Sequence, residues 1–162
     1  MIARACAVPG RALLQSYVGA GANYTDCFEV MSPGAVTLPD FIAAFYTTWL
    51  FRLERAVLTV TLRRQIADTD VQALAQGADR FAAWTVEGRE DAQILLCDTS
   101  GHTRSYLAVS AKNGGVTRLI FGSAVVAPRD KPLGRGVSFL IPLHRFYSKA
   151  LLRLAERKLR HS

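Results

Sequence analysis

Four strand-like segments follow one another in the second half of the chain, and this pattern constrains the fold most. They span residues 81–87, 92–98, 104–111 and 116–126, and short turns containing Gly, Asn, Asp or Ser separate them. Short connections favour antiparallel pairing, because a parallel pair needs a long crossover. We therefore predict an antiparallel meander.

The first half contains one more strand and a helical stretch. Residues 24–31 alternate between two faces. One face carries Tyr24, Asp26, Phe28 and Val30, and the other carries Thr25, Cys27, Glu29 and Met31. Pro39 and Asp40 indicate a helix start, and no Gly or Pro follows until about residue 65. This stretch predicts one helix, or two joined by a bend in the β-branched segment 57–61. A short helix is expected over 70–76.

A final helix is predicted over residues 142–160. Projected at about 100° per residue, its expected core stripe consists of Leu143, Phe146, Tyr147, Ala150, Leu151 and Leu154. Leu152 and Leu159 fall outside that stripe, beside Ser148 and Ala155. This second apolar patch suggests a homodimer interface. Tolerated surface leucines, cover from the N-terminal arm, or a less favoured contact with an anionic membrane are the alternatives.

Residues 1–23 are rich in Ala and Gly and show no sustained period, so we expect a flexible or loosely docked arm before one domain spanning 24–162. The three cysteines match neither a disulfide framework nor a C-x-x-C motif, which favours a reducing compartment. With no signal-peptide core and no long apolar run, the expected location is the cytoplasm.

The composition is globular but basic, with 50% hydrophobic residues, a formal net charge of +7 and a pI of about 9.8. Such charge is compatible with an anionic partner, but no nucleic-acid-binding motif accompanies it, so no specific nucleic acid is expected. Catalytic motifs are also missing. His102, His144 and His161 are widely spaced, and we expect neither a metal site nor a cofactor.

The order of strand, helical segment, meander and terminal helix resembles the helix-grip fold of START-like (polyketide cyclase and lipid-transfer-like) proteins. The chain is similar to a group of uncharacterised bacterial members of this superfamily. The resemblance is carried by residues 24–30, 41–53, 119–126 and 142–145. It implies an α+β fold in which an antiparallel sheet wraps the C-terminal helix. It also implies a cavity between sheet and helix that often holds an apolar ligand.

Two titratable residues are candidates for the polar part of such a site. Asp26 shares a strand face with apolar residues, where a carboxylate must be paired or have a raised pKa. It is either a general base or ligand anchor, or a solvated residue at a frayed strand end; if the core face is inverted, Glu29 takes its place. His144 lies at the start of the last helix, as a cavity-rim donor or a boundary histidine with satisfied hydrogen bonds.

Aromatic and basic side chains complete the predicted site. The candidate pocket-lining aromatics are Tyr46, Trp49, Trp84, Tyr106 and Phe121. Each is also compatible with an ordinary core position. Arg104 and Arg118 lie in strands, where an inward guanidinium can hold a carboxylate or phosphate and an outward one is solvated. We assign Arg118 to the candidate site.

These observations favour binding of a small apolar or amphipathic molecule, because binding needs only a lined cavity. One alternative is a cavity enzyme of the cyclase, dehydratase or isomerase type, with Asp26 and His144 as acid and base. The other is a homodimeric interaction protein without a ligand.

Overall fold

The computed structural model of the chain describes residues 1–21, 23–52, 67–127 and 135–161; side chains are described except those of 135–140. Its strands form one antiparallel sheet in the order β1-β2-β7-β6-β5-β4-β3. They are β1 (Arg4–Ala5), β2 (Tyr24–Pro33), β3 (Arg80–Phe81), β4 (Trp84–Glu90), β5 (Gln93–Asp98), β6 (Thr103–Lys112) and β7 (Val116–Val125). Helices α1 (Leu38–Tyr46), α3 (Asp68–Ala75) and α4 (Arg135–Arg160) and the 3₁₀ helix η1 (Leu13–Tyr17) complete the described elements.

The sheet confirms the predicted meander, since β4, β5, β6 and β7 pair in sequence order. β2 then pairs with β7 along ten residues, from Tyr24 opposite Val125 to Pro33 opposite Val116. Two short strands, β1 and β3, were not expected. Phe81 belongs to β3, and a tight turn separates it from Trp84, so the segment expected as one strand over 81–87 is a hairpin.

α1 begins where the sequence predicts and ends much earlier. The Thr37 side chain accepts a hydrogen bond from the Asp40 amide at 3.3 Å, which caps the helix. α1 ends at Tyr46, and Thr47 Oγ1 bonds back to the Ala43 carbonyl at 2.5 Å. Helical backbone resumes at Trp49. The break thus precedes 57–61, a segment outside the described residues.

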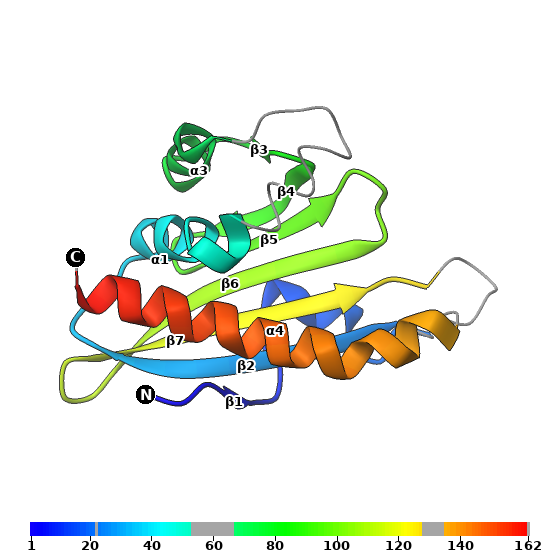
Figure 1. The fold of residues 1–162 in the computed structure, drawn as a ribbon, viewed down its shortest axis with the longest axis horizontal. Coiled ribbons are helices and arrows are strands. Elements are labelled where there is room, and N and C mark those ends of the chain that lie inside the picture. Colours follow the sequence, from blue (N-terminus) through cyan, green and yellow to red (C-terminus); the bar gives the residue numbers. More distant parts are fainter. Residues whose placement is uncertain (22, 53–66, 128–134, 162) are drawn as a thin grey trace.

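α4 lies along one face of the sheet, in front of β2 and β7 (Figure 1), which confirms the α+β class with an antiparallel sheet packed against a long C-terminal helix. It begins at Arg135 rather than at 142, so Pro142 lies inside the helix.

The buried face of α4 differs from the predicted stripe. Ser148, Leu152 and Ala155 are fully buried, whereas Leu143 and Phe146 are 65% and 73% exposed. Leu151 is buried as predicted. The small Ser148 and Ala155 side chains allow a close approach between the helix and the sheet, which explains the rotated face.

This rotation removes the basis of the predicted dimer interface. Leu152 is completely buried, and the half-buried Leu159 packs against the main core. The two leucines therefore belong to the core of one chain. The apolar residues that α4 leaves exposed are different ones.

The N-terminal segment covers the opposite face of the sheet. Arg4 and Ala5 pair with β2, and η1 lies behind the sheet (Figure 1). Leu14 is fully buried over Gly122, where a Cβ atom would come within 2.6 Å of Leu14 Cδ2. Only glycine leaves room for this contact. The sheet therefore lies between two apolar layers, a main one under α1, α3 and α4 and a second one under the N-terminal segment.

The rotated face of α4 predicts opposite outcomes for two leucines of that helix. Leu152→Ala should lower the free energy of unfolding by about 2–5 kcal/mol, because it leaves a cavity in the core. Leu143→Ala, at an exposed position, should change it by less than about 0.5 kcal/mol. Chemical denaturation of both variants measures the difference. Equal effects would contradict this placement of the helix.

A cysteine pair tests the docking of the N-terminal segment. The Sγ atoms of Cys6 and Cys27 lie 3.5 Å apart, and the neighbouring Cys27 thiol lowers the pKa of Cys6. The Cys6 thiolate should therefore attack oxidised glutathione and release one reduced glutathione, after which the Cys27 thiolate displaces the second glutathione from Cys6 and closes a disulfide. Peptide mapping of the oxidised protein should show the Cys6–Cys27 crosslink, and Cys97 should remain outside it. Random pairing among the three cysteines would show that the segment is not docked.

Candidate ligand-binding cavity

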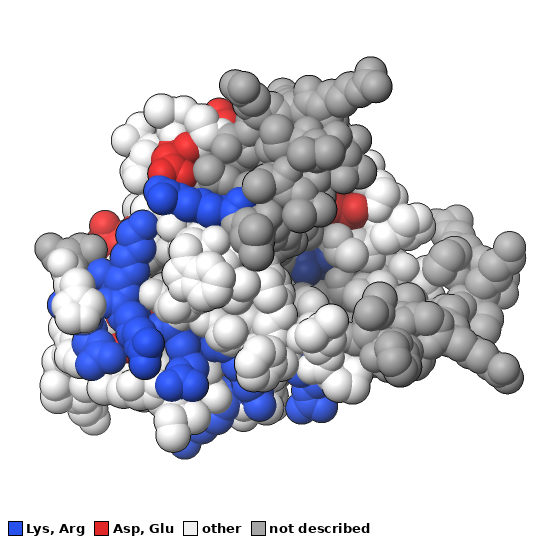
Figure 2. Space-filling model, viewed as in Figure 1, with Lys and Arg blue, Asp and Glu red and all other residues white. Residues whose placement is uncertain are grey.

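A cavity of about 260 Å³ lies between the sheet, α1 and α4. Its apolar lining consists of Phe45, Tyr46, Phe51, Trp84, Phe121, Ala124, Val125, Tyr147 and Leu151. Polar residues contribute at one end, namely Thr103, Arg104, Ser105, Ser123 and His144. The space-filling view shows a hollow near the middle of this face, with a basic side chain in its depth (Figure 2).

The polar end of the cavity comes from one row of residues across the sheet. Asp26 of β2 is paired with Ser123 of β7, and Ser123 is paired with Ser105 of β6. The next row on the same face is apolar, with Phe28 opposite Phe121. Strand register therefore places three polar side chains side by side on a surface that is otherwise hydrophobic.

A hydrogen-bonded chain connects this row to α4. Ser123 Oγ donates to Asp26 Oδ1 at 2.6 Å and lies 2.8 Å from Nε2 of His144. Because the hydroxyl has a single proton, Ser123 accepts from His144 in this arrangement. The same imidazole nitrogen is 3.6 Å from Asp26 Oδ2. These hydrogen bonds thus connect the Asp26 carboxylate, which is 7% exposed, to the His144 side chain, which is 37% exposed.

Two tyrosines hold the ends of the polar row. The Tyr24 hydroxyl donates to Asp26 Oδ2 at 3.1 Å. Burial is the main cause that raises the pKa of Tyr24 to about 12, and the negative charge of Asp26 is the second. At the other end, the hydroxyls of Tyr46 and Ser105 form a buried hydrogen bond of 2.9 Å. Tyr46 also packs edge to face on Phe45 and Phe51, which fixes its ring. The row is therefore held in place before any ligand enters.

The structure brings together part of the predicted site. Tyr46, Trp84, Phe121 and His144 line the cavity, and Asp26 lies directly behind Ser123. The predicted face of β2 is thus the face towards α4, and Glu29 lies on the other one.

Three predicted site residues lie elsewhere. Trp49 is 64% exposed, because helical backbone resumes there beyond the end of α1. Tyr106 belongs to the second core layer, where its hydroxyl bonds to Gln93 Oε1 at 2.9 Å. Arg118 forms an ion pair with Glu29 on the same outer face. These placements are corrections to the predicted pocket.

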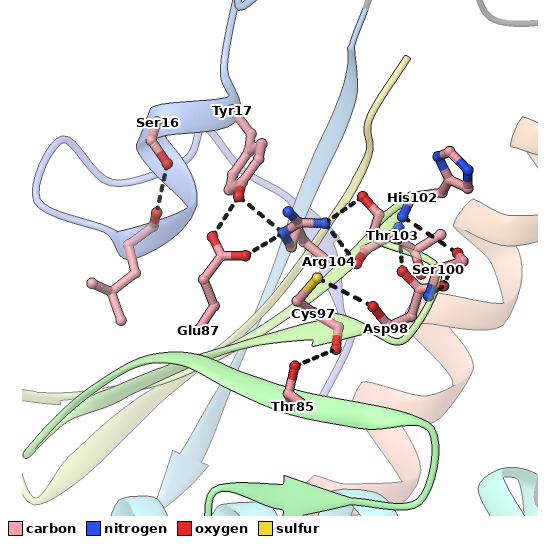
Figure 3. A network of polar contacts seen from close by, with 12 residues as sticks. Ser16, Tyr17, Thr85, Glu87, Cys97, Asp98, Ser100, His102, Thr103 and Arg104 are labelled. Atoms are coloured by element: carbon pink, nitrogen blue, oxygen red, sulfur yellow. Dashed lines mark hydrogen bonds and ion pairs between the residues drawn. The ribbon is translucent and has the colours of Figure 1, made fainter. Parts of the chain in front are cut away.

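Arg104, considered as an anchor for an anionic group, is held by other residues (Figure 3). Its guanidinium forms an ion pair with Glu87 at 2.6 Å and donates to the Tyr17 hydroxyl at 2.9 Å. It also lies 4.8 Å from the centre of the Tyr17 ring. The Glu87 carboxylate thus compensates its charge.

Sequence reasoning missed Ser105 and Ser123, the two hydroxyls of the polar row. Ser123 interrupts the apolar run 119–126, and this interruption is the one local signal that marks it. A serine on a strand is usually solvated, however, and only the pairing with Asp26 distinguishes this one.

Within the described residues, no group of three His, Cys, Asp or Glu side chains is arranged to hold a metal ion. No helix in the described ranges is both long and apolar enough to cross a bilayer.

No protein-family model matches the sequence, and no curated protein matches it either. Among solved structures, the chain is similar to the crystal structure of Ara h 8.0201. The TM-score is 0.43 and the identity 8%, over 86% of this chain and 99% of the other. The fold is established by the strand pairing and helix packing of the chain itself.

The ion pairs on the outer face predict how acid affects stability. Burial opposes ionisation of Glu29, but hydrogen bonds and charges from Arg4 and Arg118 outweigh it and lower the pKa of Glu29 below 4.5. Its stabilising contribution is therefore present above the usual carboxyl pKa and is lost as pH falls through the lowered value.

Near neutral pH, Glu29→Gln should lower the free energy of unfolding by about 1–3 kcal/mol. The difference in the free energy of unfolding between this variant and the wild type should become smaller below pH 4.5. Urea denaturation across a pH series measures it, with Asp91→Asn at an exposed turn as the control. A gap that stays constant down to acid pH would contradict the ion-pair assignment.

Proposed function

We propose that this protein binds a small, largely apolar molecule with one uncharged polar group in the cavity between the sheet and α4. The observation that carries the proposal is an aromatic-lined cavity with a single polar end. Ligand sites typically combine an apolar lining with a few fixed polar groups. The resemblance to START-like proteins supports the same proposal.

The size of the cavity limits the ligand. At about 260 Å³ it lies slightly below the range of roughly 300–1,000 Å³ typical of pockets for drug-sized ligands. The lining includes the aromatic rings of Trp84, Phe121 and Tyr147, which provide flat apolar surfaces. A compact molecule of one or two rings fits these dimensions.

The charges at the polar end favour a neutral ligand. Asp26 lies behind Ser123, and its charge disfavours a carboxylate at this position. The Arg104 guanidinium does not offset that repulsion, because Glu87 already pairs with it. In a neutral imidazole, donation from Nε2 of His144 to Ser123 leaves the other ring nitrogen as an acceptor. An alcohol or phenol can donate to that acceptor.

Binding accounts for this geometry more directly than catalysis does. Asp26 and His144, the predicted acid and base, both contact the Ser123 hydroxyl. The Asp26 carboxylate is 7% exposed and accepts the Ser123 proton, whereas a general base must come within hydrogen-bond reach of the substrate proton. The enzyme alternative predicts turnover that is lost in Asp26→Asn and His144→Ala while folding is preserved.

Titration calorimetry with a matched pair of probes tests the proposal. Naphthol should bind more tightly than naphthoic acid, because the two share a ring system and differ in charge. His144→Ala should weaken naphthol binding about fivefold, as expected for one lost hydrogen bond. His102→Ala, at an exposed turn, is the matched control and should bind like the wild type. Absence of binding by both probes would contradict the cavity proposal, and tighter binding of the acid would contradict the polar-end assignment.

A further inference from the structure

The outward face of α4 carries an apolar row that is only partly covered by the described part of the chain. It consists of Leu143, Phe146, Ala150 and Leu154. The first two are mainly exposed, and the other two are half-buried. A spacing of three or four residues places all four along one side of the helix. Exposed apolar patches of this kind mark surfaces that contact a partner.

A basic row runs beside the apolar one. Arg145, Lys149, Arg153 and Arg157 are spaced by four residues, which covers about 18 Å of helix. In the described ranges none of the four forms an ion pair, although Lys149 lies over the Phe28 ring. The space-filling view shows Lys and Arg side chains gathered along α4, with few acidic ones near them (Figure 2).

An exposed tryptophan lies near the same helix. Lys158 of α4 donates to Thr47 Oγ1 at 2.5 Å, and Trp49 follows two residues later. Tryptophan favours the boundary between headgroups and acyl chains, where its ring is amphipathic. The chain has two tryptophans, and Trp84 lines the cavity.

We propose that the outward face of α4 docks on an anionic phospholipid bilayer. The apolar row would enter the boundary between headgroups and acyl chains, and the basic row would contact the lipid phosphates and anionic headgroups. Charge complementarity selects this partner over a second copy of the chain. A two-fold contact through this face would bring two unpaired basic rows together. The inference does not depend on the proposed ligand, because none of its residues lines the cavity.

Sedimentation with vesicles tests the docking. The wild type should bind vesicles of phosphatidylcholine mixed with phosphatidylglycerol. It should not bind vesicles that contain phosphatidylcholine only. High salt should release it, because the attraction is screened. In Trp84→Phe, where Trp49 is the remaining tryptophan, emission should shift to shorter wavelength on binding. Equal binding to both kinds of vesicle, or binding that salt does not reduce, would overturn the proposal.

Charge reversal on α4 gives the sharper measurement. The double substitution Arg153→Glu with Arg157→Glu should weaken vesicle binding at least tenfold, because each basic residue near an anionic surface contributes substantially to the free energy of binding. Arg11→Glu with Lys112→Glu changes net charge equally at exposed positions outside α4 and should bind nearly as the wild type does. Equal loss in both double variants would show general charge attraction and overturn the assignment.

Removal of the apolar row separates a membrane from a protein partner. Leu143→Ser with Phe146→Ser should abolish the Trp49 shift while leaving thermal unfolding unchanged, because both positions are exposed. Light scattering without vesicles should show a monomer for every variant. A concentration-dependent dimer that the serine variant abolishes would assign the face to a second copy and overturn the lipid proposal.

Discussion

The pairing of β2 with β7 is the constraint on which the rest of the structure depends. It joins strands that are more than eighty residues apart, from Asp26 opposite Ser123 to Phe28 opposite Phe121 and beyond. Because side chains alternate along a strand, a slip of one residue would turn every side chain to the other face. One register therefore determines the polar row of the cavity, the floor of the main core and the glycine beneath Leu14.

Local periodicity predicted the elements that depend on nearby residues. The meander, the two faces of β2 and the start of α1 at Pro39 follow from alternation, turn composition and capping. The orientation of α4 does not. Its apolar residues extend around most of the circumference, so the core face is decided by how closely the helix approaches the sheet. Ser148 and Ala155 allow that approach, and no pattern within the helix shows it.

Local sequence likewise predicted some residues of the candidate site, whereas others depend on strand pairing. Asp26 and His144 are unusual for their local surroundings, and both lie at the polar end of the cavity. Ser123 becomes distinctive only through its strand partner. Tyr106 was predicted to line the cavity because of its aromatic side chain, whereas it lies in the second core layer, which the N-terminal segment covers. An amphipathic strand and a strand buried on both faces differ little over ten residues.

The N-terminal segment occupies a site built by the other end of the sheet. Leu14 packs over Gly122 of β7, and the Leu13 amide donates to the Gln93 side chain at 3.0 Å beside β5. Residues 13 and 14 therefore have no complete docking site until the chain has been synthesised as far as β7, about 100 residues later. Loop closure on that scale is slow. This segment thus precedes the sheet in synthesis and yet is among the last parts of the domain to reach its native position.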